Sequence, residues 1–164
     1  MGGEPPNGLS FHSAVTRLVT LVDLNDEVAD ARQMSVSARH EAVLDDGRRV
    51  LLLDDRGWTA AALTASQVGR VDHSDIWAVT SVEDIEETAR VVVGPDEPPD
   101  GYSQEEAEAA HWAYLADILH HQGVVVDALE LKRLPHDVIL TERLRELVEA
   151  LPYDRATFPR FDTN

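Results

Sequence analysis

The chain has 164 residues, no cysteine, and 31 acidic against 14 basic side chains, which gives a formal net charge of −17. The lack of cysteine excludes disulfide frameworks, thiolate catalysis and cysteine-ligated zinc, and the excess of acid argues against binding to nucleic-acid phosphates or to an anionic membrane surface. Because no apolar run is long enough for a membrane span and the start lacks the features of a signal peptide, we expect a soluble cytoplasmic protein.

The first part of the chain is predicted to be a flexible lead-in over residues 1–10, rich in glycine and proline. Residues 11–33 should then form an accessory amphipathic helix, since apolar side chains recur at helical spacing from Phe11 to Val22. That helix could cover the rest of the protein or join two copies in a homodimer, and the sequence leaves both alternatives open. A single α+β domain is predicted over residues 34–152, followed by an irregular tail at 153–164.

An antiparallel sheet of three to four strands is predicted within residues 36–80. Turn signals at 45–47 and 54–57 separate three β-like runs. The run at 50–53 is apolar on both faces, which is typical of a central strand. A short fourth strand is predicted at 76–79. The N-terminal helix and several C-terminal helices should cover this sheet, giving an α+β fold.

The second half of the chain is predicted to be mainly helical. Ser81 with Asp84 and Ser103 with Glu106 have the spacing of capping boxes, so we expect helices from Ser81 to Gly94 and from Ser103 to about Gly123. Two shorter helices are predicted after the N-cap residues Asp127 and Thr141.

Negative charge concentrates in residues 81–123, which contain 11 acidic side chains against the single basic residue Arg90. If the two helices and their loop lie side by side, they form one acidic face. We therefore favour a non-catalytic interaction or regulatory protein that binds a basic protein partner there. The predicted contact residues are Glu83, Asp84, Glu86, Glu87, Asp96, Glu97, Asp100, Glu105 and Glu106. A competing interpretation is that these residues are solvated helix faces and favourable charges at two helix N-termini.

Glu108 and His111 support a different hypothesis, because a carboxylate and an imidazole three residues apart point along one face of a helix. They are candidate catalytic or ligand-binding residues of a pocket beside the sheet, which would make the chain a small-molecule-binding domain or a small enzyme. A purely structural hydrogen-bonded pair is the alternative. Whether the chain is an enzyme stays undecided, with the non-catalytic hypothesis favoured.

No metal site or cofactor is expected from the sequence. The loop after Asp96 places Pro98 and Ala107 where a calcium loop needs ligands. His40 and Glu41 begin a zincin motif that lacks its second histidine. Among the other histidines, His120 and His121 are expected to be solvated, and His136 to stabilise a turn with Asp137.

Overall fold

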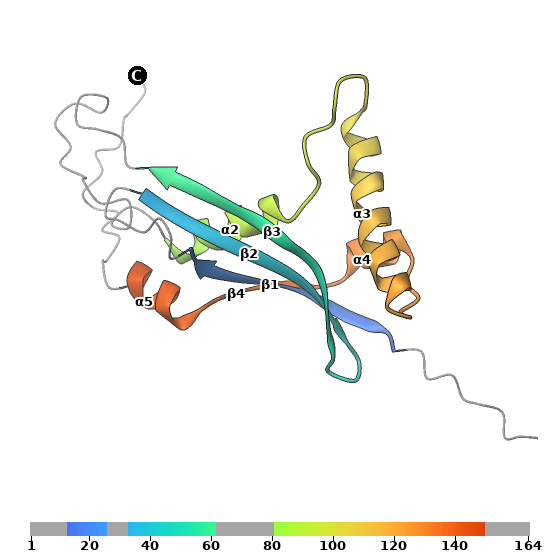
Figure 1. Cartoon of the computed structure of the whole chain (residues 1–164), viewed down its shortest axis with the longest axis horizontal. Helices are drawn as coiled ribbons and strands as arrows, with labels where there is room; N and C mark the ends of the chain where they lie inside the picture. Colours follow the sequence, from blue (N-terminus) through green and yellow to red (C-terminus); the bar gives the residue numbers. More distant parts are fainter. Residues whose placement is uncertain (1–12, 26–32, 62–80, 150–164) are drawn as a thin grey trace, which may run out of the picture.

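A computed structural model of the chain describes residues 13–25, 33–61 and 81–149 (Figure 1). The lead-in at 1–10, the strand predicted at 76–79 and the tail at 153–164 lie outside these ranges. The described part contains, in chain order, β1 (Val15–Leu24), β2 (Gln33–Leu44), β3 (Arg49–Ala61), α2 (Val82–Val92), α3 (Gln104–His121), α4 (Ala128–Arg133), β4 (His136–Leu140) and α5 (Glu142–Glu149). The α+β class predicted from the sequence is therefore confirmed.

The four strands form one mixed sheet in the order β3-β2-β1-β4. β1 and β2 are antiparallel, as are β2 and β3, whereas β4 runs parallel to β1. The prediction of a purely antiparallel sheet is therefore wrong. A parallel neighbour requires a long crossover connection, and here the chain passes through α2, α3 and α4 before it returns as β4.

The predicted N-terminal helix is also wrong, because its core forms β1, an internal strand of the sheet. Val19 and Leu18 are both buried, so the strand is covered on both faces. Such a strand has a nearly continuous apolar run, which also satisfies helical spacing. The β-branched residues Val15, Val19 and Val22 favoured the strand.

The hairpin between β2 and β3 turns at 45–47, as predicted, with Gly47 at a φ of 84°. The second predicted turn, at 54–57, is absent, because β3 continues through it. The strand absorbs these residues with register shifts opposite His40, which turn both Leu52 and Leu53 into the core. The bulge turns consecutive residues of the run at 50–53 towards the core, which accounts for its apolar character. β3 is an edge strand of the described sheet and not the central strand that the sequence predicts.

The predicted caps account for the helices that begin where expected. Ser81 and Asp84 close a capping box on α2, and Ser103 and Glu106 close one on α3. Asp127 caps α4 through the N–H groups of the first helical turn. These local contacts satisfy amide groups that would otherwise lack partners at a helix N-terminus.

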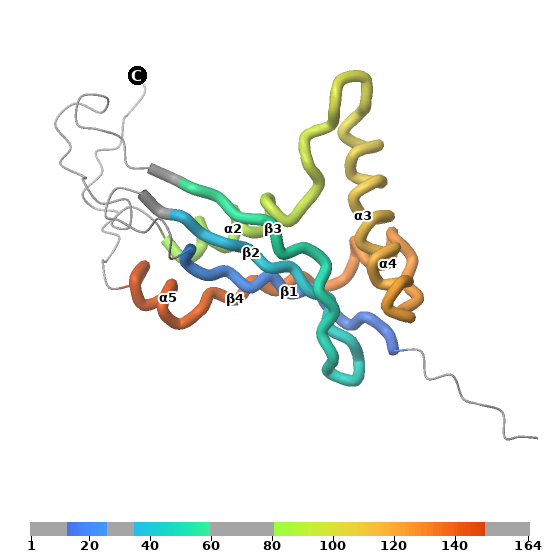
Figure 2. The backbone as a smooth tube through the Cα atoms, viewed as in Figure 1, coloured from blue at the N-terminus to red at the C-terminus, as the bar shows by residue number. Residues whose placement is uncertain are grey.

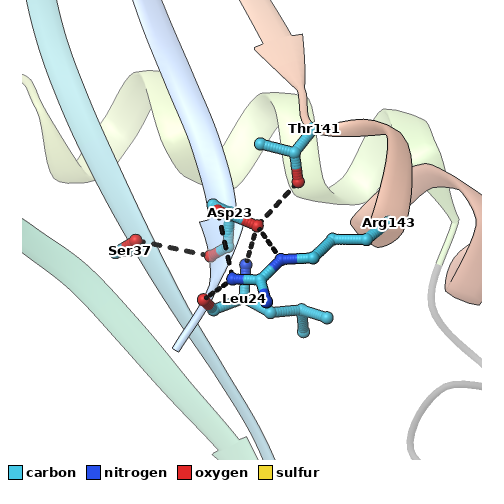
Figure 3. A network of polar contacts seen from close by, with 5 residues as sticks. All are labelled: Asp23, Leu24, Ser37, Thr141 and Arg143. Atoms are coloured by element: carbon cyan, nitrogen blue, oxygen red, sulfur yellow. Dashed lines mark hydrogen bonds and ion pairs between the residues drawn. The ribbon is translucent and has the colours of Figure 1, made fainter. Parts of the chain in front are cut away.

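Thr141 precedes α5, but its hydroxyl donates a 2.7 Å hydrogen bond to Asp23 on β1. Arg143 donates from Nε to the same carboxylate oxygen at 2.8 Å, and Figure 3 shows both side chains converging on Asp23. The guanidinium of Arg143 lowers the pKa of Asp23 below its ordinary value. The contacts attach the start of α5 to the end of β1.

The helices pack on one face of the sheet, where two apolar clusters form the core. The first cluster lies between the sheet and α3 and α4 and includes Leu18, Leu115, Leu119 and Leu131. The second lies between the sheet and α2 and α5 and includes Val22, Ile85, Leu144 and Val148. Within residues 13–25, 33–61 and 81–149, no helix has the length and apolar character needed to cross a bilayer.

Candidate binding cavity between β3 and α3

A cavity of about 580 Å³ lies between β3, the loop that follows α2, and α3. Val93 is the C-cap of α2, and the loop crosses to Ser103, whose capping box fixes the start of α3 beside β3. Figure 2 shows the path of this loop from the end of α2 to the start of α3. The cavity is lined by Leu52, Leu53, Asp54, Asp55, Arg56, Asp96, Glu97, Pro99, Ala107, Ala110, His111 and Tyr114.

The lining carries four carboxylates and a single arginine. Arg56 on β3 reaches across to Asp96 in the loop and donates hydrogen bonds to both carboxylate oxygens, the longer at 3.3 Å. This contact raises the pKa of Arg56 and lowers that of Asp96. Asp54 and Glu97 form no ion pair with any described residue. The cavity therefore keeps a net negative charge.

His111 forms part of the cavity wall from α3 and is only 9% exposed. Its Nε2 has no hydrogen-bond partner in the described part of the chain. Burial lowers the pKa of His111, with a further contribution from Arg56. The imidazole is therefore neutral at pH 7 and keeps one acceptor nitrogen.

The structure separates the two residues that the sequence pairs on α3. Glu108 does not line the cavity, and one of its carboxylate oxygens lies 2.8 Å from Nζ of Lys132 on α4. His111 instead makes an edge contact with Trp112, with ring centroids 5.3 Å apart. Trp112 packs against the first core cluster. Glu108 and His111 therefore do not form a hydrogen-bonded pair.

The nine acidic residues predicted to bind a partner occupy different places. Asp96 and Glu97 line the cavity, whereas Asp84 and Glu106 are engaged in capping boxes. The others belong to α2, the loop or the first turn of α3: Glu83, Glu86, Glu87, Asp100 and Glu105. α2 packs on the sheet in the second core cluster and α3 in the first, at separate places along the sheet (Figures 1 and 2). The two helices are not side by side, so these residues are not gathered on one helix pair.

Three cavity residues of β3, Asp54, Asp55 and Arg56, were not among the predicted site residues. Their sequence resembles a turn, and that interpretation concealed their role as a strand edge facing α3. Two consecutive carboxylates directly after an apolar run were the available signal. Among the described residues, no group of three or more histidine, aspartate or glutamate side chains is placed to hold a metal ion.

The remaining histidines differ in their environments. His121 is exposed on α3, and its Nδ1 lies 2.8 Å from the carbonyl oxygen of Asp117. His120 contacts the carbonyl oxygen of Val126. His136 is half-buried, and its hydrogen bond goes to Thr20 on β1 instead of to its neighbour Asp137. Sequence reasoning missed this contact because it depends on β4 pairing with β1.

Comparison of the chain with protein-family models, with curated proteins and with solved structures gives no match.

Proposed function

We propose that this chain is a non-catalytic binding protein that accepts a cationic side chain of a basic protein partner in the cavity between β3 and α3. The observation that supports this proposal is the lining of the cavity, which combines four carboxylates and one arginine with apolar side chains. The acidic recognition surface is then the cavity lining, where the β3 residues Asp54 and Asp55 join Asp96 and Glu97.

The shape and chemistry of the lining suit a lysine or arginine side chain. Leu52, Leu53 and Pro99 offer apolar surface to the methylene groups of such a side chain, while the carboxylates attract its charged end. Tyr114 is 58% exposed at the edge of the cavity, where its ring is available for stacking or a cation–π contact. The neutral imidazole of His111 does not repel a cation.

The overall charge of −17 adds a long-range contribution, because a strongly acidic protein attracts a basic partner before contact. Such attraction raises the association rate and weakens as salt screens it. Charge alone does not fix the site of contact, which is why the proposal depends on the cavity.

The enzyme hypothesis receives less support, because it needs a carboxylate beside His111 to orient or share a proton. Glu108 forms an ion pair with Lys132. Asp96, a carboxylate of the cavity lining, forms an ion pair with Arg56. General acid–base catalysis requires an imidazole within hydrogen-bond reach of its partners. The residues therefore favour binding over catalysis.

Calorimetric titration of the full chain with a hexa-arginine peptide tests the proposal. We expect binding that weakens with added salt, and an affinity that falls about tenfold or more when Asp54→Asn and Glu97→Gln are combined. The matched control combines Glu83→Gln and Glu87→Gln on α2, which removes the same charge outside the cavity and should change the affinity only through long-range attraction. Equal losses in the two double variants would contradict the proposal. Tight binding of a free polyamine, with no binding of the peptide, would point to a small cation instead of a protein.

A further inference from the structure

Thr20 lies in the core between two histidines, with no exposed surface of its own. Its hydroxyl oxygen is 2.9 Å from Nδ1 of His40 and 2.7 Å from Nε2 of His136. His40 stands directly opposite Thr20 in the pairing of β2 with β1, and His136 begins β4 on the other side. The three side chains therefore link three neighbouring strands on the face that the helices cover.

One hydroxyl between two imidazole nitrogens restricts where the protons can be. The hydroxyl has a single proton, so it can donate to only one ring. The other ring must then present an N–H that donates to the hydroxyl oxygen. Because the rings face Thr20 through different nitrogens, Nδ1 of His40 and Nε2 of His136, this condition is met when both histidines hold the same tautomer. The hydroxyl and both facing nitrogens then have hydrogen-bond partners in the core.

We propose that Thr20, His40 and His136 form an acid-sensitive lock, which joins β2, β1 and β4 while both imidazoles are neutral and opens when they are protonated. If both rings carry a proton on each nitrogen, both must donate to Thr20, and the hydroxyl proton loses its acceptor. The two cationic rings would also be in contact, with centroids 5.0 Å apart. Like charges at that separation inside a protein repel strongly.

The groups around the lock oppose protonation. The positive charge of Arg90 on α2 lowers the pKa of His136. On α3, protonation of His111 would likewise lower the pKa of His40. Asp137 beside His136 is the carboxylate that acts in the other direction. Burial, followed by His136 and His111, lowers the pKa of His40 to about 3. Burial likewise lowers the pKa of His136.

The sign of the pH dependence follows from these directions. A histidine in the unfolded chain has a pKa near 6.5, whereas in the folded lock the pKa of His40 is about 3 and burial lowers the pKa of His136 below its ordinary value. The unfolded state therefore binds more protons, and stability is complete above about pH 6.5 and declines as the pH falls towards about 3. His40 alone should raise the unfolding equilibrium constant roughly 25-fold between pH 7 and pH 5, and the lowered pKa of His136 should increase this rise further.

Urea denaturation of the full chain at pH 7 and pH 5 tests the lock. A double variant with His40→Asn and His136→Gln keeps hydrogen-bonding groups near the two nitrogens but cannot titrate. We expect it to lose most of the pH dependence. The matched control combines His120→Gln and His121→Gln on α3 and should retain the dependence of the unaltered chain. A double variant that retains it as well would overturn the proposal.

Nitrogen NMR of the histidine rings tests the lock without any substitution, should the double variant fail to fold. At pH 7 we expect one of the two nitrogens facing Thr20 to carry a proton and the other to be bare. His40 should stay neutral at pH 5 in the folded protein. Two rings in different tautomers, which would leave both facing nitrogens protonated or both bare, would contradict the proposal. A His40 ring that titrates near pH 6.5 would contradict it as well.

Discussion

Nζ of Lys132 on α4 lies 2.8 Å from Oε1 of Glu108 on α3, and this contact separates Glu108 from the histidine one turn along its own helix. Sequence spacing places Glu108 and His111 on one helical face, but that face meets two different surroundings. At Glu108 it meets α4, while at His111 it meets β3 and the cavity. The division explains why the two residues are expected to behave differently when substituted.

Glu108→Gln should have little effect on either stability or binding. Both side chains of the ion pair are more than one-third exposed, and surface pairs of this kind contribute less than about 1 kcal/mol. We expect a correspondingly small change in urea denaturation and an unchanged affinity for the hexa-arginine peptide. A large loss of binding in this variant would restore the hypothesis that Glu108 and His111 act together.

Arg56→Gln should increase the affinity for the same peptide, by about threefold to tenfold, because it removes a competing positive charge and releases Asp96. Arg49→Gln is the matched control on the same strand. Arg49 pairs with Glu41, on the opposite face of the sheet from the helices, and its loss should leave the affinity nearly unchanged. If Arg56→Gln instead weakens or abolishes binding, the cavity recognises an anionic group through Arg56, and the proposed ligand class is wrong.

Leu119→Ala should destabilise the protein by about 2–5 kcal/mol, because the side chain is fully buried between the sheet and the α3–α4 pair. Leu129→Ala is the same substitution on α4, at a side chain that is 63% exposed. Its cost should stay below about 1 kcal/mol. Equal effects in denaturation experiments would show that α3 does not pack on the first core cluster as described.

Gly57→Ala should destabilise the protein by about 2 kcal/mol or more, because the added Cβ would lie 2.4 Å from the carbonyl oxygen of Val36 on β2. Gly47→Ala provides the comparison. Gly47 has a positive φ but open space around it, so its cost should be near 1 kcal/mol. A harmless Gly57→Ala would indicate that residues 54–57 form the turn expected from sequence and not part of β3.

The elements predicted correctly are those fixed by contacts close in sequence. α2 and α3 begin at Ser81 and Ser103 because each capping box involves residues only three apart. The hairpin at Gly47 depends equally on a local backbone conformation. Periodicity and cap chemistry contain all the information that such elements require.

The errors occurred where pairing between distant strands decides the structure. β1 satisfied helical spacing because both of its faces are buried, and β4 was missed because its five residues become a strand only beside β1. The cavity was missed in part for the same reason. Asp54 and Asp55 resemble a turn until a bulge and the packing of α3 place them opposite Asp96. The charge pattern of the sequence identifies Asp96 and Glu97 as candidate binding residues, but it does not identify Asp54 and Asp55 as their neighbours in the cavity.

Mapping backbone amide shifts during titration with the hexa-arginine peptide is the most direct test of the cavity as the binding site. We predict that the largest changes fall on Leu53, Asp54 and Arg56 of β3 and on Asp96 and Glu97 of the loop, with a change in the ring signals of His111. The exposed acidic residues of α2 should shift little. Changes centred on α2, or spread evenly over every acidic segment, would contradict the proposal that the cavity between β3 and α3 receives the basic partner.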